Sequence, residues 1–114
     1  MTEHQIQKAF FHWLRLKMRG VYDVAYAIPN GGQRHIAVAA KLKAEGVKAG
    51  VPDICIPIAR HGFNALYIEL KTGKGKATPG QVDFMDKLTQ CNNLTVLCRG
   101  LDAAIDAIEG YMGG

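Results

Sequence analysis

The chain is predicted to form an α/β domain in which a mixed β-sheet is flanked by α-helices. Three observations support this. Helix and strand patterns alternate along the 114 residues, two neighbouring strands are joined by a short glycine-containing loop, and capping signals mark the helix starts. The predicted order is helix, strand, helix, strand, strand, helix, strand, helix. The length allows one domain, spanning residues 1–114, with an ordinary core.

Composition narrows the class of protein. Hydrophobic residues make up 48% and charged residues 21%, which is typical of a globular chain, and no apolar run approaches the roughly 18 residues of a membrane helix. The N-terminal sequence lacks a signal-peptide pattern, and three cysteines at no framework spacing read as core residues, so a cytoplasmic location is expected. The net charge of +4 suits a polyanionic partner but does not by itself identify one.

The first helix is predicted over Thr2 to Met18. Thr2 followed by Gln5 matches a capping box, and Glu3 in the first turn complements the positive end of the helix dipole. The apolar residues recur at helical spacing: Ile6, Ala9, Phe10, Trp13 and Leu14.

A short strand, a helix and a hairpin follow. The stretch DVAYAIPNGG predicts a strand ending in a turn, and Arg34 to Glu45 predicts an alanine-rich helix ended by Gly46. Two β-rich runs, Asp53 to Ile58 and Ala65 to Lys71, are joined by ARHGFN, whose length and glycine are typical of a hairpin loop.

The last third of the chain predicts a helix, a strand and a helix. Thr78 is the expected N-cap and Pro79 the first helical residue of a helix that ends near Gln90. Its buried face is predicted to contain Phe84, Met85 and Leu88. The run LTVLC predicts the last strand, and the final helix carries an apolar stripe formed by Leu101, Ala104, Ile105, Ile108 and Tyr111.

Charged residues stand at the ends of the two hairpin strands. Side chains two apart in a strand share a face, so Glu69 and Lys71 point away from the apolar face. Antiparallel pairing then brings Asp53 opposite this end, within about 5 Å, the spacing of neighbouring strands. Two carboxylates and an ammonium group are therefore expected to converge at one end of the sheet.

Such a pair of carboxylates suits a hard divalent cation. Oxygen ligands favour Mg²⁺ or Mn²⁺ over Zn²⁺, and Mg²⁺ commonly leaves coordination positions for the oxygens of a phosphodiester. Lys71 would orient the attacking water, neutralise developing charge or act as a base. The alternative is a surface salt bridge between Glu69 and Lys71, with Asp53 capping a turn.

The linked motifs resemble a known nuclease family. GVPD followed by YIELK resembles the PD-(D/E)XK motif, and NGGQR, LKAEGVKAGVPD and IELKTGKGKATPGQ resemble its VRR-NUC (virus-type replication-repair nuclease) branch. The resemblance covers residues 30–81 closely and the first helix loosely. It implies a restriction-endonuclease-like fold, with a mixed β-sheet flanked by α-helices.

The resemblance also implies roles for particular residues. Asp53 and Glu69 would be metal ligands, the backbone carbonyl of Leu70 a further ligand, and Lys71 the catalytic lysine. Gln81 matches a glutamine of the following helix and Glu3 an acid of the first helix, so both are candidate catalytic residues. Two alternatives remain open at this stage: Gln81 also completes a capping box with Thr78, and Glu3 also suits the helix dipole.

Four residues are candidate nucleic-acid contacts. The resemblance implies that Asn30 and Arg34 approach DNA phosphates, although Asn30 and the glycines after it also suit a simple turn. Lys74 and Lys76 lie in a glycine-rich loop, where they are expected to contact the nucleic-acid backbone. The loop lacks the GxxxxGK[ST] spacing of a nucleotide-hydrolysing P-loop.

These observations predict a Mg²⁺-dependent endodeoxyribonuclease, and the family resemblance implies that it leaves 5′-phosphate and 3′-hydroxyl ends. Family members that stand alone, often viral, are similar to Holliday junction resolvases, so branched DNA is the expected substrate and a homodimer the expected assembly. Two alternatives are a sequence-specific restriction-type endonuclease and a non-catalytic DNA-binding module with a nuclease fold.

Overall fold

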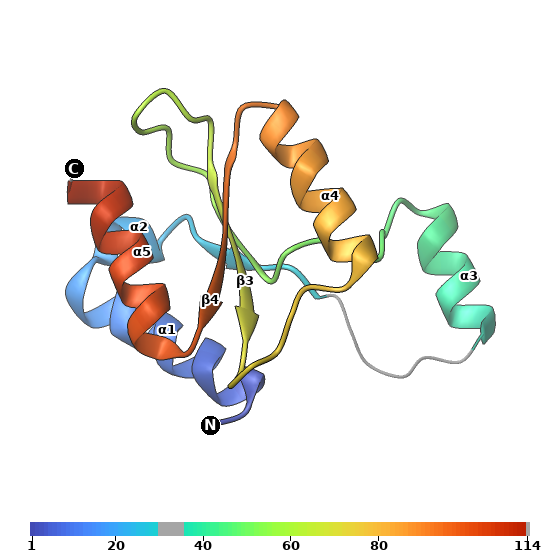
Figure 1. Cartoon of the computed structure of the whole chain (residues 1–114), viewed down its shortest axis with the longest axis horizontal. Helices are drawn as coiled ribbons and strands as arrows, with labels where there is room; N and C mark the ends of the chain where they lie inside the picture. Colours follow the sequence, from blue (N-terminus) through green and yellow to red (C-terminus); the bar gives the residue numbers. More distant parts are fainter. Residues whose placement is uncertain (30–35, 114) are drawn as a thin grey trace.

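The computed structural model describes residues 1–29 and 36–113 (Figure 1). The elements are α1 (Glu3–Lys17), α2 (Arg19–Tyr22), β1 (Tyr26–Ala27), α3 (Ile36–Ala44), β2 (Ile54–Ile56), β3 (Leu66–Lys71), α4 (Pro79–Gln90), β4 (Leu94–Arg99) and α5 (Leu101–Gly113).

The four strands form one mixed sheet in the order β1-β2-β3-β4. The pairs β1–β2 and β2–β3 are antiparallel, whereas β3 and β4 are parallel. The parallel pair needs a crossover connection, and α4 supplies it. The predicted fold class is therefore confirmed, and so is the antiparallel pairing of the two strands joined by ARHGFN.

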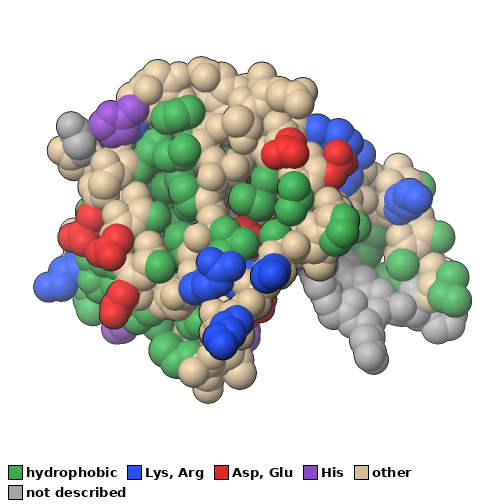
Figure 2. Space-filling view, in the orientation of Figure 1, with side chains coloured by type: hydrophobic (Ala, Val, Ile, Leu, Met, Phe, Trp, Pro, Cys, Tyr) green, Lys and Arg blue, Asp and Glu red, His purple; other side chains and the backbone are tan. Residues whose placement is uncertain are grey.

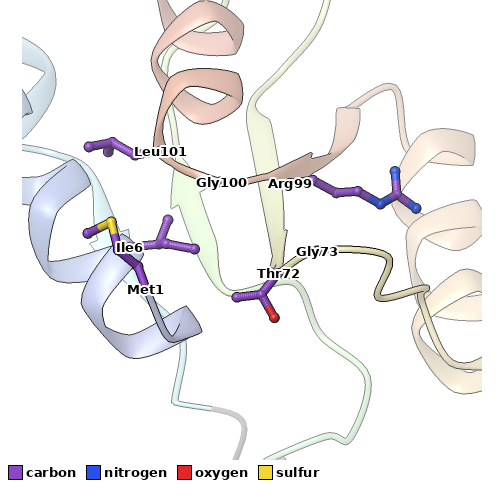
Figure 3. A pocket seen from close by; sticks show the side chains of 7 residues that line it. All are labelled: Met1, Ile6, Thr72, Gly73, Arg99, Gly100 and Leu101. Carbon is purple, nitrogen blue, oxygen red and sulfur yellow. The ribbon is translucent and has the colours of Figure 1, made fainter.

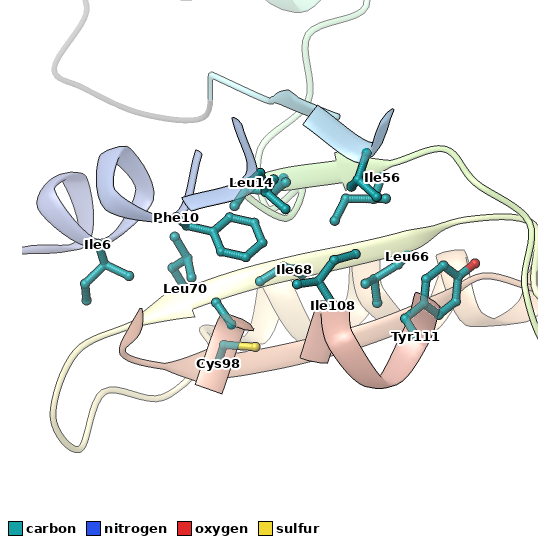
Figure 4. Packing of buried hydrophobic residues seen from close by; sticks show 13 residues of the cluster. Ile6, Phe10, Leu14, Ile56, Leu66, Ile68, Leu70, Cys98, Ile108 and Tyr111 are labelled. Carbon is teal, nitrogen blue, oxygen red and sulfur yellow. The ribbon is translucent and has the colours of Figure 1, made fainter. Parts of the chain in front are cut away.

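The helices cover the two faces of the sheet unequally. In Figure 1, α1 and α5 lie together on one side of β3 and β4, and α4 lies on the other. The α1/α5 side holds the main core, where α1 and α5 side chains pack on alternate residues of β3 (Figure 4). Ten of its buried side chains are Ile6, Phe10, Leu14, Ile56, Leu66, Ile68, Leu70, Cys98, Ile108 and Tyr111. On the other side, α4 presents the half-buried Phe84, Met85 and Leu88, and none of its residues is fully buried.

Two helix starts form as their sequences predict. The Thr2 hydroxyl accepts from the Gln5 N–H while the Gln5 side chain accepts from the Thr2 N–H, which completes a capping box. Thr78 and Gln81 form the same reciprocal pair at the start of α4. Each pair satisfies backbone N–H groups that have no partner within the helix.

Several boundaries differ from the prediction. The short helix α2, which follows α1, was not predicted. The strands β1 and β2 are shorter than predicted. Pro57 follows β2 directly and has no N–H to donate to a neighbouring strand, which explains why β2 ends at Ile56. The prediction that all three cysteines are core residues is wrong for Cys91, which is exposed because it caps the C-terminus of α4.

The helix α3 stands apart from the rest of the fold (Figure 1). It ends before Gly46, as predicted, and that glycine adopts a φ of +99°. None of the α3 residues is buried, and Ile36 is 84% exposed. In the described ranges 1–29 and 36–113, the helices are all too short or too polar to cross a membrane.

Candidate active site

Asp53 lies opposite Glu69 at one end of the sheet. Ile54 pairs with Ile68 in the antiparallel register, so the preceding residue, Asp53, reaches the Glu69 level. The Asp53 Oδ2 atom accepts a hydrogen bond from the Leu70 N–H at 2.7 Å, and the Asp53 carbonyl accepts from the Ile28 N–H at 2.7 Å. Backbone contacts on both sides therefore fix this carboxylate at the edge of β3.

Glu69 is the most enclosed charged group at this end. Its side chain is 2% exposed, and its Oε2 atom lies 3.8 Å from Lys71 Nζ and 3.4 Å from Gln81 Nε2. Its Oε1 atom is buried and accepts a hydrogen bond from none of the residues that the structure describes. A buried acceptor without a partner is unfavourable, so this oxygen is placed to accept a cation or a donor from outside the chain.

Burial and a second carboxylate raise the pKa of Glu69 to about 8. Desolvation is the largest cause, followed by the charge of Asp53 and a hydrogen bond to it, while the Lys71 ammonium opposes the shift. The charge of Glu3 also raises this pKa, so the start of α1 lies near enough to act on Glu69 although Glu3 itself is exposed.

Gln81 completes the capping box and also contacts Glu69. Its Oε1 atom accepts from the Thr78 N–H at 2.8 Å, which completes the capping box. Its Nε2 atom donates to Glu69 Oε2 at 3.4 Å. Because the carbonyl and the amine of one amide are used separately, capping does not compete with contact to the site.

Gly50 allows the Asp53 loop to lie against the start of α4, a contact that the sequence pattern did not reveal. It adopts a φ of +82°, and a Cβ added there would lie 2.7 Å from the Gly80 carbonyl oxygen. The obstructing atoms belong to the backbone, so no side-chain rotation could relieve the overlap. The glycine in the GVPD stretch was the available signal, because positive φ and close backbone approach both favour glycine.

Leu70 contributes backbone groups to the site. Within a strand, the N–H and the carbonyl of one residue point to the same side. Since the Leu70 N–H binds Asp53, its carbonyl also faces the Asp53 side. The described part of the chain contains no cluster of three or more His, Cys, Asp or Glu side chains placed to bind a metal. A cation here would instead use the carboxylates of Asp53 and Glu69, this carbonyl, and oxygens of water or substrate.

This oxygen donor set fits Mg²⁺ or Mn²⁺. Both ions prefer hard oxygen ligands, and Mg²⁺ needs only one or two carboxylates when phosphate and water complete its coordination. The unpartnered Glu69 Oε1 atom is the observation that supports the fit.

Positive side chains gather beside the site. Lys74 and Lys76 are exposed in the loop after β3, as predicted, while Asn30 and Arg34 lie outside the described residues. Arg99, which sequence reasoning did not single out, pairs in register with Lys71 and donates from Nε to the Gly75 carbonyl at 3.2 Å. Figure 2 shows Lys and Arg side chains clustered over this loop.

A mixed sheet flanked by helices, with two carboxylates and a lysine at one end, is an arrangement typical of PD-(D/E)XK nucleases. The VRR-NUC domain model matches residues 1–102, so the chain belongs to the VRR-NUC family. A solved structure described as a VRR_NUC domain protein is 34% identical with a TM-score of 0.86, over 99% of this chain and 89% of that one. No match is found among curated proteins. Membership implies a nuclease of the PD-(D/E)XK type that acts on DNA.

Proposed function

We propose that this protein is a Mg²⁺-dependent, structure-selective DNA endonuclease of the Holliday-junction-resolvase type. The observation that carries the proposal is the buried Glu69 carboxylate, which faces Asp53 and Lys71 and has one oxygen without a hydrogen-bond donor in the described ranges 1–29 and 36–113. An ordinary surface salt bridge would not be buried in this way, because isolated carboxylates avoid burial unless something compensates for lost hydration.

Asp53, Glu69 and the Leu70 carbonyl are the proposed ligands. When bound, the ion would supply charge stabilisation for the phosphodiester and would lower the pKa of a water. The protein holds its own oxygens in place beforehand, since the Leu70 N–H fixes Asp53 and the Gln81 amide contacts Glu69. Prior fixing of these groups reduces the reorganisation needed when substrate arrives.

Lys71 is the proposed catalytic lysine. Its ammonium lies 3.8 Å from Glu69 Oε2 on the same face of β3, with its side chain 12% exposed. At this position it can donate a hydrogen bond to the attacking water or to a phosphate oxygen, or act as the base. In the proposed reaction water attacks the phosphorus, the P–O3′ bond breaks and the leaving O3′ oxygen takes up a proton, which gives a 5′-phosphate and a 3′-hydroxyl. Glu3, at the start of α1, is proposed to act from outside the ligand set through its charge and through water.

A homodimer is the proposed active assembly. Resolution of a four-way junction needs two cuts in two strands, and the described part of one chain carries one such site. A two-fold axis would place two equivalent sites at a fixed separation. The proposed selectivity is for the shape of branched DNA, because Lys74, Lys76 and the proposed contacts of Asn30 and Arg34 would meet phosphates, and phosphate contacts carry no sequence information.

Cleavage of defined DNA structures tests the proposal. Purified protein would be incubated with labelled four-way junction, flap and linear duplex DNA in Mg²⁺, in Mn²⁺ and in EDTA, and its mass in solution measured by light scattering. The expected result is paired cuts in the junction by a dimer, abolished by EDTA and reduced at least about 100-fold in Lys71→Ala.

Other outcomes would point elsewhere. Cutting of linear duplex at fixed sequences would indicate a restriction-type enzyme, and DNA binding without cutting in either metal would indicate a non-catalytic module. A cleavage rate of Lys71→Ala equal to that of the wild type would contradict the proposed catalytic role of this lysine.

A further inference from the structure

A groove of about 330 Å³ lies at the same end of the sheet as the candidate active site. It is bounded by the start of α1, the loop after β3, and the turn between β4 and α5 (Figure 3). Met1, Ile6 and Leu101 lie together on one side, Thr72 lies in the middle, and Arg99 lies beyond Thr72 with its side chain directed away from the other three. The groove thus has one apolar wall and one cationic edge.

Besides Thr72, two glycines lie between these two sides. Gly73 and Gly100 line the groove, and a Cβ added to either would meet nothing within 4 Å. The space above them is therefore open, not merely small.

The groove adjoins the candidate active site through covalent and strand neighbours. Thr72 directly follows Lys71, and Arg99 is the strand partner of Lys71 on β4. Ile6 lies one helical turn after Glu3. Glu69 and Lys71 face the α4 side of β3. A DNA strand whose phosphate is bound by Lys71 and by a cation on Asp53 and Glu69 would therefore pass around the end of β3 to place its next nucleotide at the groove.

Charge and shape favour a nucleotide over an apolar ligand. Arg99 is the cationic residue among those that line the groove, and none of these lining residues is acidic. Lys74 and Lys76 are exposed further along the loop that continues from Gly73. The volume is at the lower end of the range for sites that bind small organic molecules. An apolar wall beside a cationic edge matches a nucleotide, which has an apolar base and an anionic phosphate.

We propose that this groove binds one nucleotide of the DNA strand next to the scissile phosphate. The base lies against Ile6 and Leu101, and the adjacent phosphate lies towards the Thr72 hydroxyl and Arg99. The proposal rests on the proposed nuclease function, because that function supplies the DNA. It adds a contact to the substrate that the metal-binding carboxylates and Lys71 do not provide.

Removal of single bases tests the groove. Junction DNA carrying one abasic nucleotide, placed in turn at each position around the cut, would be titrated with protein in Ca²⁺ and followed by fluorescence anisotropy. The wild-type protein should lose about tenfold in affinity at one position only, as expected for one base contact. In Leu101→Ala that penalty should disappear, whereas in Ile105→Ala, a half-buried neighbour one turn along α5, it should remain.

A second variant blocks the groove without truncating the core. Gly73 has a φ of +51°, which asparagine tolerates, and its added side chain would enter open space. Gly73→Asn should keep the wild-type melting temperature and bind intact junction about tenfold more weakly. Gly62→Asn, a matched change in the hairpin at the far end of the sheet, should bind normally.

The experiments can contradict the groove proposal and the proposed nuclease function separately. The groove proposal would be overturned if an abasic nucleotide did not weaken binding by the wild-type protein, or weakened binding by Leu101→Ala equally. Wild-type affinity of Gly73→Asn for intact junction would also overturn it. So would the lack of DNA binding by wild-type protein. Binding that depends on the groove, together with no cleavage in Mg²⁺ or Mn²⁺, would instead overturn the proposed nuclease function alone.

Discussion

The carboxylate of Asp53 and the backbone N–H of Leu70 are joined by a 2.7 Å hydrogen bond. This bond continues the pairing of β2 with β3 beyond the last backbone pair, because a side-chain oxygen takes the place of a strand carbonyl. The same residue therefore has a structural role, through one oxygen, and a proposed role as metal ligand.

Substitutions of Asp53 separate these two roles. Asp53→Asn retains an oxygen that can accept from the Leu70 N–H, so its stability should stay within about 0.5 kcal/mol of the wild type. Asp53→Ala leaves that N–H without its partner and should lose about 1–2 kcal/mol. Both variants should lose Mg²⁺-dependent cleavage. Urea unfolding and junction cleavage would measure the two effects, and full activity in Asp53→Asn would contradict the ligand role.

The two capping boxes provide a matched pair for Gln81. Gln5→Ala and Gln81→Ala each remove the glutamine half of a capping box. Each should lose about 0.5–1 kcal/mol of unfolding free energy. Only Gln81→Ala also removes the contact to Glu69, so only this variant should cleave at least about tenfold more slowly. Equal cleavage rates in the two variants would show that Gln81 is a cap alone.

Gly50→Ala should separate backbone strain from close contact. Gly46→Ala provides the control, because Gly46 also has a positive φ but its added Cβ would meet nothing within 4 Å. Gly46→Ala should therefore lose about 1–2 kcal/mol through strain alone. Gly50→Ala should lose a further 1–3 kcal/mol or so, because its methyl group overlaps the Gly80 carbonyl.

The overlap in Gly50→Ala should displace the Asp53 loop, and this displacement should also affect the active site. It separates the Asp53 loop from the start of α4, so cleavage should fall by about tenfold or more even under conditions where the protein is folded. Thermal unfolding and cleavage at 20 °C would be measured for both glycine variants. Equal stability and equal cleavage rates in Gly50→Ala and Gly46→Ala would show that the close contact between Gly50 and Gly80 is not important for the site.

Glu69 should make the metal-free protein less stable as the pH rises. The pKa of Glu69 is about 8 in the folded protein, whereas an unperturbed glutamate titrates near pH 4.3, about the value expected in the unfolded chain. Between these values the folded state holds a proton that the unfolded state has released. The stabilising contribution is therefore complete below about pH 4.3 and is lost as the pH rises through 8.

Glu69→Gln should remove this dependence. In EDTA the variant should match the wild type near pH 4.5 and exceed its unfolding free energy at pH 8.5 by about 1–3 kcal/mol, the scale of an uncompensated buried group. Asp106→Asn, an exposed change on α5, should follow the wild-type pH profile. Parallel profiles for wild type and Glu69→Gln would show that Glu69 is not titrating in this range.

The sequence predicted the central pair of strands correctly because two local rules agree there. Alternation in YIELK assigns Glu69 and Lys71 to one face, and the short ARHGFN loop fixes the antiparallel partner, which brings Asp53 to the same end. Capping signals at Thr2 and Thr78 also depend only on neighbouring residues, and both form as expected.

Features that depend on distant segments were not predictable in the same way. The contact of Gly50 with Gly80 joins residues 30 positions apart, and the position of Arg99 beside the loop after β3 follows from the parallel pairing of β4. The isolation of α3 was also hidden, because an alanine-rich helix has the same sequence pattern whether or not another element covers it. Local patterns indicate what an element is, but not what lies against it.

The six residues of β3 supply the middle of the core and two of the proposed catalytic groups at once, in strict alternation. Insertion of one residue before Glu69 would turn its carboxylate into the packed layer beneath α1 and α5 and bring Leu70 to the position of Lys71. Related proteins that keep the activity are therefore expected to vary in the length of the hairpin loop or of the loop after β3, but never by a single position within this strand.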